Sequence, residues 1–122
     1  MKISTYKDLI VWQKAMNLVN EIYAITENFP KDETYGLKSQ MQRAVISIPS
    51  QIAEGYLRRH KKEYTHFLSI SLGSAAELET QIIACKSLSK FKKFDFVKSE
   101  LLLNEIMKML YVMIKKMEVK TI

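Results

Sequence analysis

Residues 41–59 have the sequence MQRAVISIPSQIAEGYLRR, in which apolar side chains recur at every third or fourth position. Val45 and Ile52 fall on one helix face, and the spacing keeps its phase on both sides of Pro49. A proline inside a helix removes one backbone hydrogen bond and clashes with the carbonyl group four residues earlier. The pattern therefore predicts one amphipathic helix over residues 33–59 that is kinked at Pro49.

The same spacing predicts three further helices, over residues 8–29, 62–88 and 94–118. Capping residues accompany two of the predicted helix starts: Asp8 for the first helix, and Asp32 or Thr34 for the second. Amphipathic helices joined by short loops bury their apolar faces most simply in an antiparallel, up-down-up-down four-helix bundle. We therefore predict an all-α fold in a single domain that covers residues 1–122.

The composition limits what the chain can be. Its 122 residues, 48% of them apolar, are enough to form the core of one domain without disulfides or a structural metal. The single cysteine, Cys85, argues against a disulfide framework or a cysteine-based zinc site, and we expect it to be a small core residue. No stretch approaches the roughly 18 apolar residues of a membrane span. We therefore expect a cytoplasmic protein.

Positive charge is concentrated in the second half of the sequence. The net charge is +6, and residues 1–57 contain equal numbers of basic and acidic residues. The excess forms three groups: Arg58, Arg59, Lys61 and Lys62; Lys90, Lys92 and Lys93; and Lys115, Lys116 and Lys120. In the predicted topology the first and third groups share one end of the bundle, and the second lies at the other end. Basic clusters suit a polyanion because each neutralised phosphate releases counterions, although basic residues at helix ends also occur without a partner.

Two of the predicted helices have more apolar surface than a bundle interior uses. The apolar arc is about 180° wide for residues 8–29 and about 160° wide for residues 94–118, against about 120–140° for the others. Leu101 and Val112 also fall on the polar side of the last helix. This surplus predicts a homo-oligomer with contacts through these two helices, whereas a monomer that exposes scattered apolar residues is the simpler alternative.

One pair of residues has the spacing of a metal-binding motif. Glu63 and His66 form a Glu-x-x-His step, which ferritin-like bundles use at di-iron sites. Such a site needs a second step and two further glutamates, and the other histidine, His60, follows Leu57 where a glutamate would be needed. We therefore predict a solvated pair beside a basic turn and no metal.

No set of residues favours catalysis. Three glutamates are candidates for acid–base work: Glu54, Glu77 and Glu79. Ion pairs with Arg43 or Lys86 are the more ordinary role for them. Four serines have no evident histidine partner for nucleophilic catalysis: Ser47, Ser50, Ser71 and Ser74. Because the three glycines are also isolated, with no phosphate-binding loop, we predict a protein without enzymatic activity or cofactor.

Three parts of the chain together resemble one protein family. They are YKDLIVWQKAM at residues 6–16, SIPSQIAEGY at 47–56, and EYTHFLSI at 63–70 followed by GSAAELETQ at 73–81. These segments resemble the bacterial 23S ribosomal RNA intervening-sequence proteins. Gln51 stands where that family usually has asparagine, and Gln42 precedes Arg43 where two arginines are common.

The resemblance implies a left-handed up-down-up-down bundle, assembly into a ring of five subunits, and no established catalytic activity. The family is also similar to the accessory protein of diversity-generating retroelements, a basic pentamer that binds nucleic acid and a reverse transcriptase. We therefore expect a non-enzymatic homo-oligomer that binds nucleic acid, in particular structured RNA, with phosphate contacts from Arg43, Arg58, Arg59, Lys61 and Lys62. The alternative is a protein-interaction scaffold that recruits another polypeptide on its helix faces.

Overall fold

The computed structural model describes residues 3–119, and its regular elements are all helical. The four long helices are α1 (Ile10–Thr26), α2 (Leu37–Tyr56), α3 (Lys61–Ser87) and α4 (Val97–Val119). Short 3-10 helices precede α1 and lie in two of the connections: η1 (Tyr6–Asp8), η2 (Lys31–Glu33) and η3 (Ser89–Phe91). The prediction of an all-α, four-helix protein is confirmed for these residues. None of the described helices is both long enough and apolar enough to cross a membrane.

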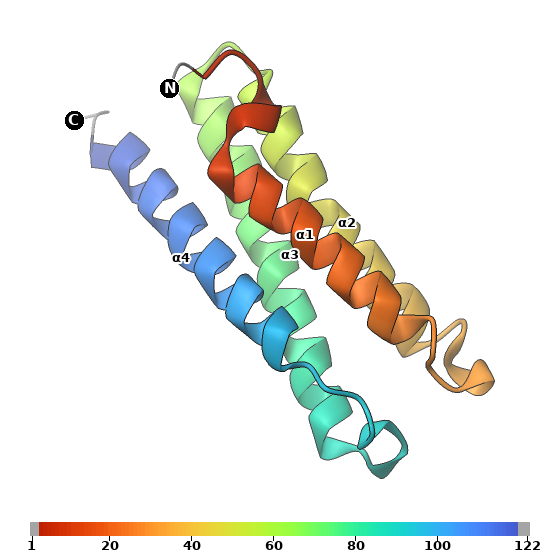
Figure 1. Ribbon diagram of the computed structural model, residues 1–122. Coiled ribbons are helices and arrows are strands. Elements are labelled where there is room, and N and C mark those ends of the chain that lie inside the picture. Colours follow the sequence, from red (N-terminus) through yellow and green to blue (C-terminus); the bar gives the residue numbers. More distant parts are fainter. Residues whose placement is uncertain (1–2, 120–122) are drawn as a thin grey trace.

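The four helices lie side by side around one core. α1 contacts α2 and α4, and α3 also contacts α2 and α4. Figure 1 shows the chain running along α1, returning along α2, and repeating this path in α3 and α4. The α2–α3 turn therefore lies at the same end of the molecule as η1 and the end of α4, and the other two connections lie at the opposite end (Figure 1).

The first long helix begins at Ile10 and not at the predicted cap, Asp8. Asp8 belongs to the preceding turn, where its carboxylate accepts hydrogen bonds from the backbone N–H groups of Ser4 and Thr5 at 3.0 and 3.2 Å. The hydrogen bond from the Ser4 backbone is the main reason that the pKa of Asp8 is lowered. Asp8 thus completes a capping box with Thr5 at the start of η1.

The second helix also begins later than predicted. Gly36 is its N-cap residue, so neither Asp32 nor Thr34 caps it. Glu33 accepts a hydrogen bond from the backbone N–H of Leu37 at 3.2 Å, which satisfies one donor of the first turn. The chain between the predicted start and Gly36 forms η2 and a turn, and its acidic residues Asp32 and Glu33 both contact Lys90 of the α3–α4 connection.

Helix α2 continues without a break through Pro49, which is buried. Small side chains on α2 and α3 let the two helices approach closely. The hydroxyl groups of Ser47 and Ser74 lie 2.8 Å apart, and Ser71 donates a hydrogen bond to the backbone carbonyl oxygen of Ile48 at 2.9 Å. The placement of Pro49 inside one helix agrees with the sequence interpretation, and the predicted kink stays a prediction.

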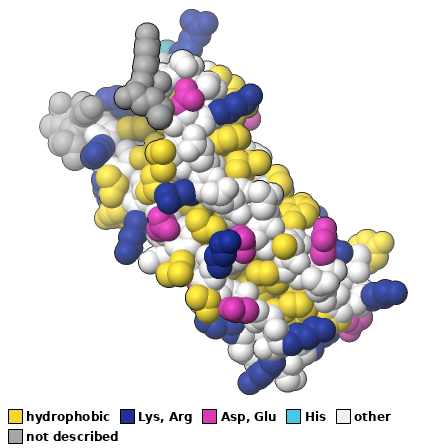
Figure 2. All heavy atoms as spheres, viewed as in Figure 1, with side chains coloured by type: hydrophobic (Ala, Val, Ile, Leu, Met, Phe, Trp, Pro, Cys, Tyr) yellow, Lys and Arg dark blue, Asp and Glu magenta, His cyan; other side chains and the backbone are white. Residues whose placement is uncertain are grey.

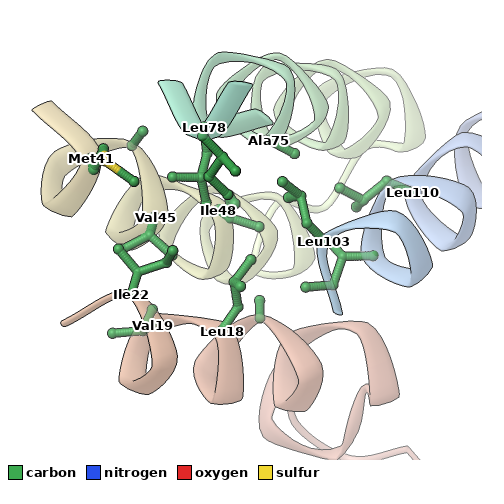
Figure 3. Packing of buried hydrophobic residues seen from close by; sticks show 14 of the residues in the cluster. Leu18, Val19, Ile22, Met41, Val45, Ile48, Ala75, Leu78, Leu103 and Leu110 are labelled. Carbon is green, nitrogen blue, oxygen red and sulfur yellow. The ribbon is translucent and has the colours of Figure 1, made fainter. Parts of the chain in front are cut away.

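Apolar side chains from all four helices fill the interior. Figure 3 shows them converging: Leu18, Val19 and Ile22 from α1, Met41, Val45 and Ile48 from α2, Ala75 and Leu78 from α3, and Leu103 and Leu110 from α4. Beyond the helix ends, the ring of Phe29 lies 4.7 Å from that of Phe91, centroid to centroid. Cys85 is fully buried, which confirms its assignment to the core.

Candidate nucleic-acid interface

The α2–α3 turn carries the densest group of basic side chains. Arg58 and Arg59 lie in the turn, Lys61 and Lys62 form the start of α3, and all four side chains are exposed. Figure 2 shows Lys and Arg side chains at this end of the molecule, with a histidine beside them. Here we call Arg59, Lys61 and Lys62 the basic turn, because Arg58 differs from them in its contacts.

Arg58 is held inside the protein's own ion-pair network. Its guanidinium group lies 3.0 Å from the Glu54 carboxylate and 3.8 Å from the Glu63 carboxylate. It also lies 4.8 Å from the centre of the Phe67 ring, where a cation–π attraction is expected. Arg58 therefore joins the end of α2 to the start of α3. The sequence contained part of this signal, because Glu54 and Arg58 are four residues apart in the helix predicted over residues 33–59.

The three residues of the basic turn have no ion pair with any residue among 3–119. The N-cap residue of α3, His60, also makes no side-chain hydrogen bond to the helix start. No N-cap side chain therefore satisfies the first backbone N–H groups of α3, whose first turn contains Lys61, Lys62 and the acidic Glu63. A helix start of this kind favours negative charge, because the helix dipole adds to the charge of the neighbouring side chains.

Two adjacent hollows lie between this turn and the end of α4. The larger has a volume of about 410 Å³ and is lined by Lys61, Lys62, Thr65, His66, Met117 and Glu118. The smaller, of about 330 Å³, is lined by Arg58, Arg59, His60, Lys61, Tyr64 and Met117. The Tyr64 ring meets the Tyr56 ring edge-on at 6.2 Å, and burial raises the pKa of Tyr64. The sequence did not predict these hollows.

The third basic group, Lys115, Lys116 and Lys120, has fewer unpaired cations near the basic turn than the sequence predicts. The Lys115 ammonium group lies 3.4 Å from the Glu118 carboxylate and 5.4 Å from the centre of the Tyr111 ring. Lys116 is exposed on the same helix. Lys120 lies outside the described residues. The part of α4 that borders the basic turn consists of Met117 and Glu118, which line the hollows.

Arg43 is separated from the other predicted phosphate contacts. It is exposed on α2, fifteen residues before Arg58 in the sequence, which corresponds to about 22 Å along the helix. It forms no ion pair or hydrogen bond through its side chain within the described part of the chain. The five predicted site residues thus form one group at the α2–α3 turn and one isolated arginine.

The second basic group, at the opposite end, is partly neutralised. Lys90 lies 3.0 Å from the Asp32 carboxylate and 2.8 Å from the Glu33 carboxylate, so it links the α3–α4 connection to η2. The hydrogen bond from Lys90 lowers the pKa of Glu33, and the same bond raises the pKa of Lys90. Lys92 and Lys93 remain exposed nearby. This end is therefore the weaker candidate for a polyanion.

Several of the residues considered for metal binding and catalysis have partners within the protein. Glu63 contacts Arg58, His66 is exposed, and no group of three or more potential metal ligands occurs among residues 3–119. The suggested pairing of glutamates with Arg43 or Lys86 is wrong for Glu54, whose partner is Arg58, and Lys86 instead contacts Glu100 at 2.9 Å. Ser50 donates a hydrogen bond to the Ile46 carbonyl group on its own helix.

A second surface feature is an apolar groove between α3 and α4. The groove has a volume of about 370 Å³, and its walls include Ile83, Val97 and Leu101, which are 59%, 60% and 63% exposed. Apolar spacing in the sequence would place Val97 on the inward face of the last helix, but it is exposed at the first turn of α4. Leu101 and Val112 are exposed, as predicted. The sequence analysis did not single out Ile83, which follows the buried Ile82 on α3 and lies on the side of the groove.

Comparison with known proteins agrees with the resemblance seen in the sequence. A family model described as 23S rRNA-intervening sequence protein matches residues 7–112 of this chain. No curated protein matches the chain. The family match begins within η1, covers α1, α2, α3 and most of α4, and therefore includes the basic turn. This chain belongs to the family of 23S rRNA-intervening sequence proteins.

Proposed function

We propose that this protein is a non-enzymatic, homo-oligomeric nucleic-acid-binding protein that binds structured RNA through the basic turn. The observation that carries the proposal is the exposure of Arg59, Lys61 and Lys62 without an acidic partner among the described residues. An RNA phosphate can replace the water and counterions around these groups without first breaking an ion pair. The family name supports RNA as the polyanion.

The roles of the five predicted contacts differ in this proposal. Arg59, Lys61 and Lys62 bind phosphates directly, and the open start of α3 adds backbone donors beside them. Arg58 acts mainly by holding the turn, since its guanidinium group is engaged by Glu54 and Phe67. Arg43 is a separate contact for a more distant phosphate.

The proposed oligomer multiplies a modest basic patch. Three cations give weak binding in one subunit, and repetition of the patch in a ring raises the overall affinity through avidity. Exposed Leu101 and Val112 support an interface that includes α4, and we propose contacts through α1 and α4. The ring of five subunits, the bacterial origin and the cytoplasmic location follow from the resemblance and the sequence, and are part of the same proposal.

The test is a salt-dependent titration of purified, nuclease-treated protein against a labelled RNA hairpin and a DNA duplex of equal length. The variant combines Arg59→Ala, Lys61→Ala and Lys62→Ala. The matched control combines Lys31→Ala, Lys92→Ala and Lys93→Ala, which removes the same charge from the opposite end. The basic-turn variant should lose affinity and reduce the slope of log affinity against log salt by about 2–3, and the control should change both far less. Equal effects of both triple variants would contradict the assignment of the site.

A protein-interaction scaffold is the second candidate, favoured by the groove with Ile83, Val97 and Leu101. Exposed apolar residues gathered on one groove are typical of surfaces that another polypeptide covers. In this candidate the positive charge serves solubility and steering only. A defined protein partner that remains bound after nuclease treatment, and is lost with Ile83→Asp, would favour the scaffold over RNA binding, since this variant leaves Leu101 and Val112 in place.

A further inference from the structure

The larger hollow beside the basic turn has two kinds of wall. Met117 of α4 and Thr65 of α3 contribute its less polar part, and the Thr65 hydroxyl lies 3.3 Å from the Met117 sulfur and 2.9 Å from the Lys61 carbonyl oxygen. That hydroxyl is therefore already engaged inside the protein. The lysine side chains add aliphatic stems below their charged ends. The hollow thus suits a flat, largely apolar group.

The rim of the same hollow is charged unevenly. Lys61 and Lys62 stand on the α3 side without an ion-pair partner among residues 3–119, and Lys61 also borders the smaller hollow with Arg59. On the α4 side stands Glu118, whose carboxylate lies 3.4 Å from Lys115. An anionic group bound at this rim is attracted to the α3 side and repelled by the α4 side. The arrangement fits a ligand with a flat body and a negative group attached to it.

An aromatic ring completes the site. His66 is exposed on the wall of the hollow, and its ring meets the Phe67 ring edge-on at a centroid distance of 5.6 Å. Nucleobases stack on aromatic side chains of this kind, and such stacking tolerates different bases because every base has a flat face. The volume of about 410 Å³ also lies in the range of about 300–1,000 Å³ that small-molecule sites occupy.

We propose that this hollow binds an unstacked nucleobase while Lys61 and Lys62 bind its phosphate, so that the protein prefers bulged or single-stranded RNA to an uninterrupted duplex. A base inside an A-form duplex is paired and stacked, and protein side chains reach bases mainly in loops, bulges and ends. The inference rests on the proposed function, because it specifies which nucleotides the same surface recognises.

The test compares two RNA hairpins with equal numbers of phosphates, one with a continuous stem and one with a single-nucleotide bulge. The full-length protein should bind the bulged RNA about tenfold more tightly, as expected for one stacked base. His66→Ala should remove this preference and leave affinity for the continuous stem unchanged. His60→Ala is the matched control, because His60 is exposed at the same turn and does not line the larger hollow. Circular dichroism of both variants checks that the helices are intact.

The possible results separate the base site from the proposed function. Equal affinity for both hairpins, with loss of binding in the basic-turn variant, would overturn the base site and leave RNA binding by the basic turn intact. Absence of binding to either hairpin would overturn both. Binding of an acidic phosphopeptide that depends on His66, without a preference for the bulged RNA, would overturn the base site in favour of a protein ligand.

Discussion

Arg58 and Arg59 are neighbours in the chain and differ in what surrounds them. Arg58 contacts two carboxylates and an aromatic ring that come from α2 and α3. Arg59 has no such partner within residues 3–119, although it borders the smaller hollow. At the scale of single residues, Arg58 therefore stabilises the junction of α2 and α3, and Arg59 is available to bind a ligand.

Single alanine variants should separate these two roles. Arg58→Ala should lower the free energy of unfolding by about 1 kcal/mol, since partly exposed ion pairs and cation–π contacts each contribute up to about that amount. Arg59→Ala should leave stability nearly unchanged and weaken RNA binding. Urea denaturation and fluorescence anisotropy measure the two quantities. An equal loss of stability in both variants would refute the distinction.

Cys85 gives a prediction about pH. The pKa of its thiol is raised to about 11 from an ordinary value of 9.0. Burial is the main cause, and the negative charge of Glu33 adds to it. Above about pH 9 the unfolded state loses this proton and the folded state keeps it, so stability should fall as the pH rises from about 9 to about 11. The contribution is of the order of 2–3 kcal/mol at the upper end.

Urea denaturation at pH 8 and pH 10.5 checks this expectation. Cys85→Ala serves as the comparison, because it keeps the titration of tyrosines and lysines and removes only the thiol. The wild-type protein should lose more stability than the variant between the two pH values. Its thiol should also resist a thiol reagent at pH 8 until the protein is unfolded. Rapid modification of the folded protein would contradict the buried position.

At the scale of helices, α2 and α3 pack tightly against each other at Gly55. A Cβ atom added at Gly55 would lie 2.8 Å from the Phe67 Cβ and 3.0 Å from a Tyr64 ring carbon. Gly73, on α3, has no atom within 4 Å of an added Cβ. Gly55 thus sets the spacing of the two helices near the basic turn, whereas Gly73 faces open space.

The two glycines should respond oppositely to alanine. Gly55→Ala should destabilise the protein by about 1–3 kcal/mol, because the added methyl group forces the helices apart. Gly73→Ala should stabilise it by about 0.5–1 kcal/mol, because alanine loses less backbone entropy in a helix. Thermal and urea unfolding compare both variants with the wild type. A stabilising effect of Gly55→Ala would mean that α2 and α3 can separate at little cost.

At the scale of the whole molecule, exposed apolar side chains lie on the outer surface of α4 and its groove with α3. Leu101 is 63% exposed and Val112 is 48% exposed, and both stand on the helix that the sequence assigned to subunit contacts. Both residues are thus uncovered in a single subunit, as the proposed interface requires. The oligomer stays a proposal, and its interface can be tested directly.

Charge placed on this surface should dissociate the proposed oligomer. Leu101→Asp combined with Val112→Asp should lower the mass measured by light scattering at micromolar concentration to that of a monomer, and RNA affinity should fall as avidity is lost. Ile70→Asp is the control, because Ile70 is exposed on α3 and does not line the α3–α4 groove. A monomeric mass for the wild-type protein would contradict the oligomer outright.

The three scales differ in how much could be predicted from the sequence. Helix periodicity predicted the four helices and the buried position of Cys85, because the phase of apolar residues depends only on local geometry. Helix starts were less predictable. Asp8 and Asp32 are residues that often cap helices, but in this structure Asp8 accepts a hydrogen bond from the Ser4 backbone and Asp32 pairs with Lys90. The exposure of Arg59, Lys61 and Lys62 followed from their place in a charged stretch where one predicted helix ends and the next begins.

The amino-acid sequence by itself determined that this chain forms four amphipathic helices and carries its strongest basic group between the second and third. Only the tertiary structure decided that the Arg58 guanidinium group lies over the Phe67 ring and that Met117 meets Thr65 beside Lys61 to form a hollow. Spacing along a helix specifies which face is apolar. Contacts between residues fifty-two positions apart depend on the rotation and offset of packed helices, which side-chain packing in the core sets.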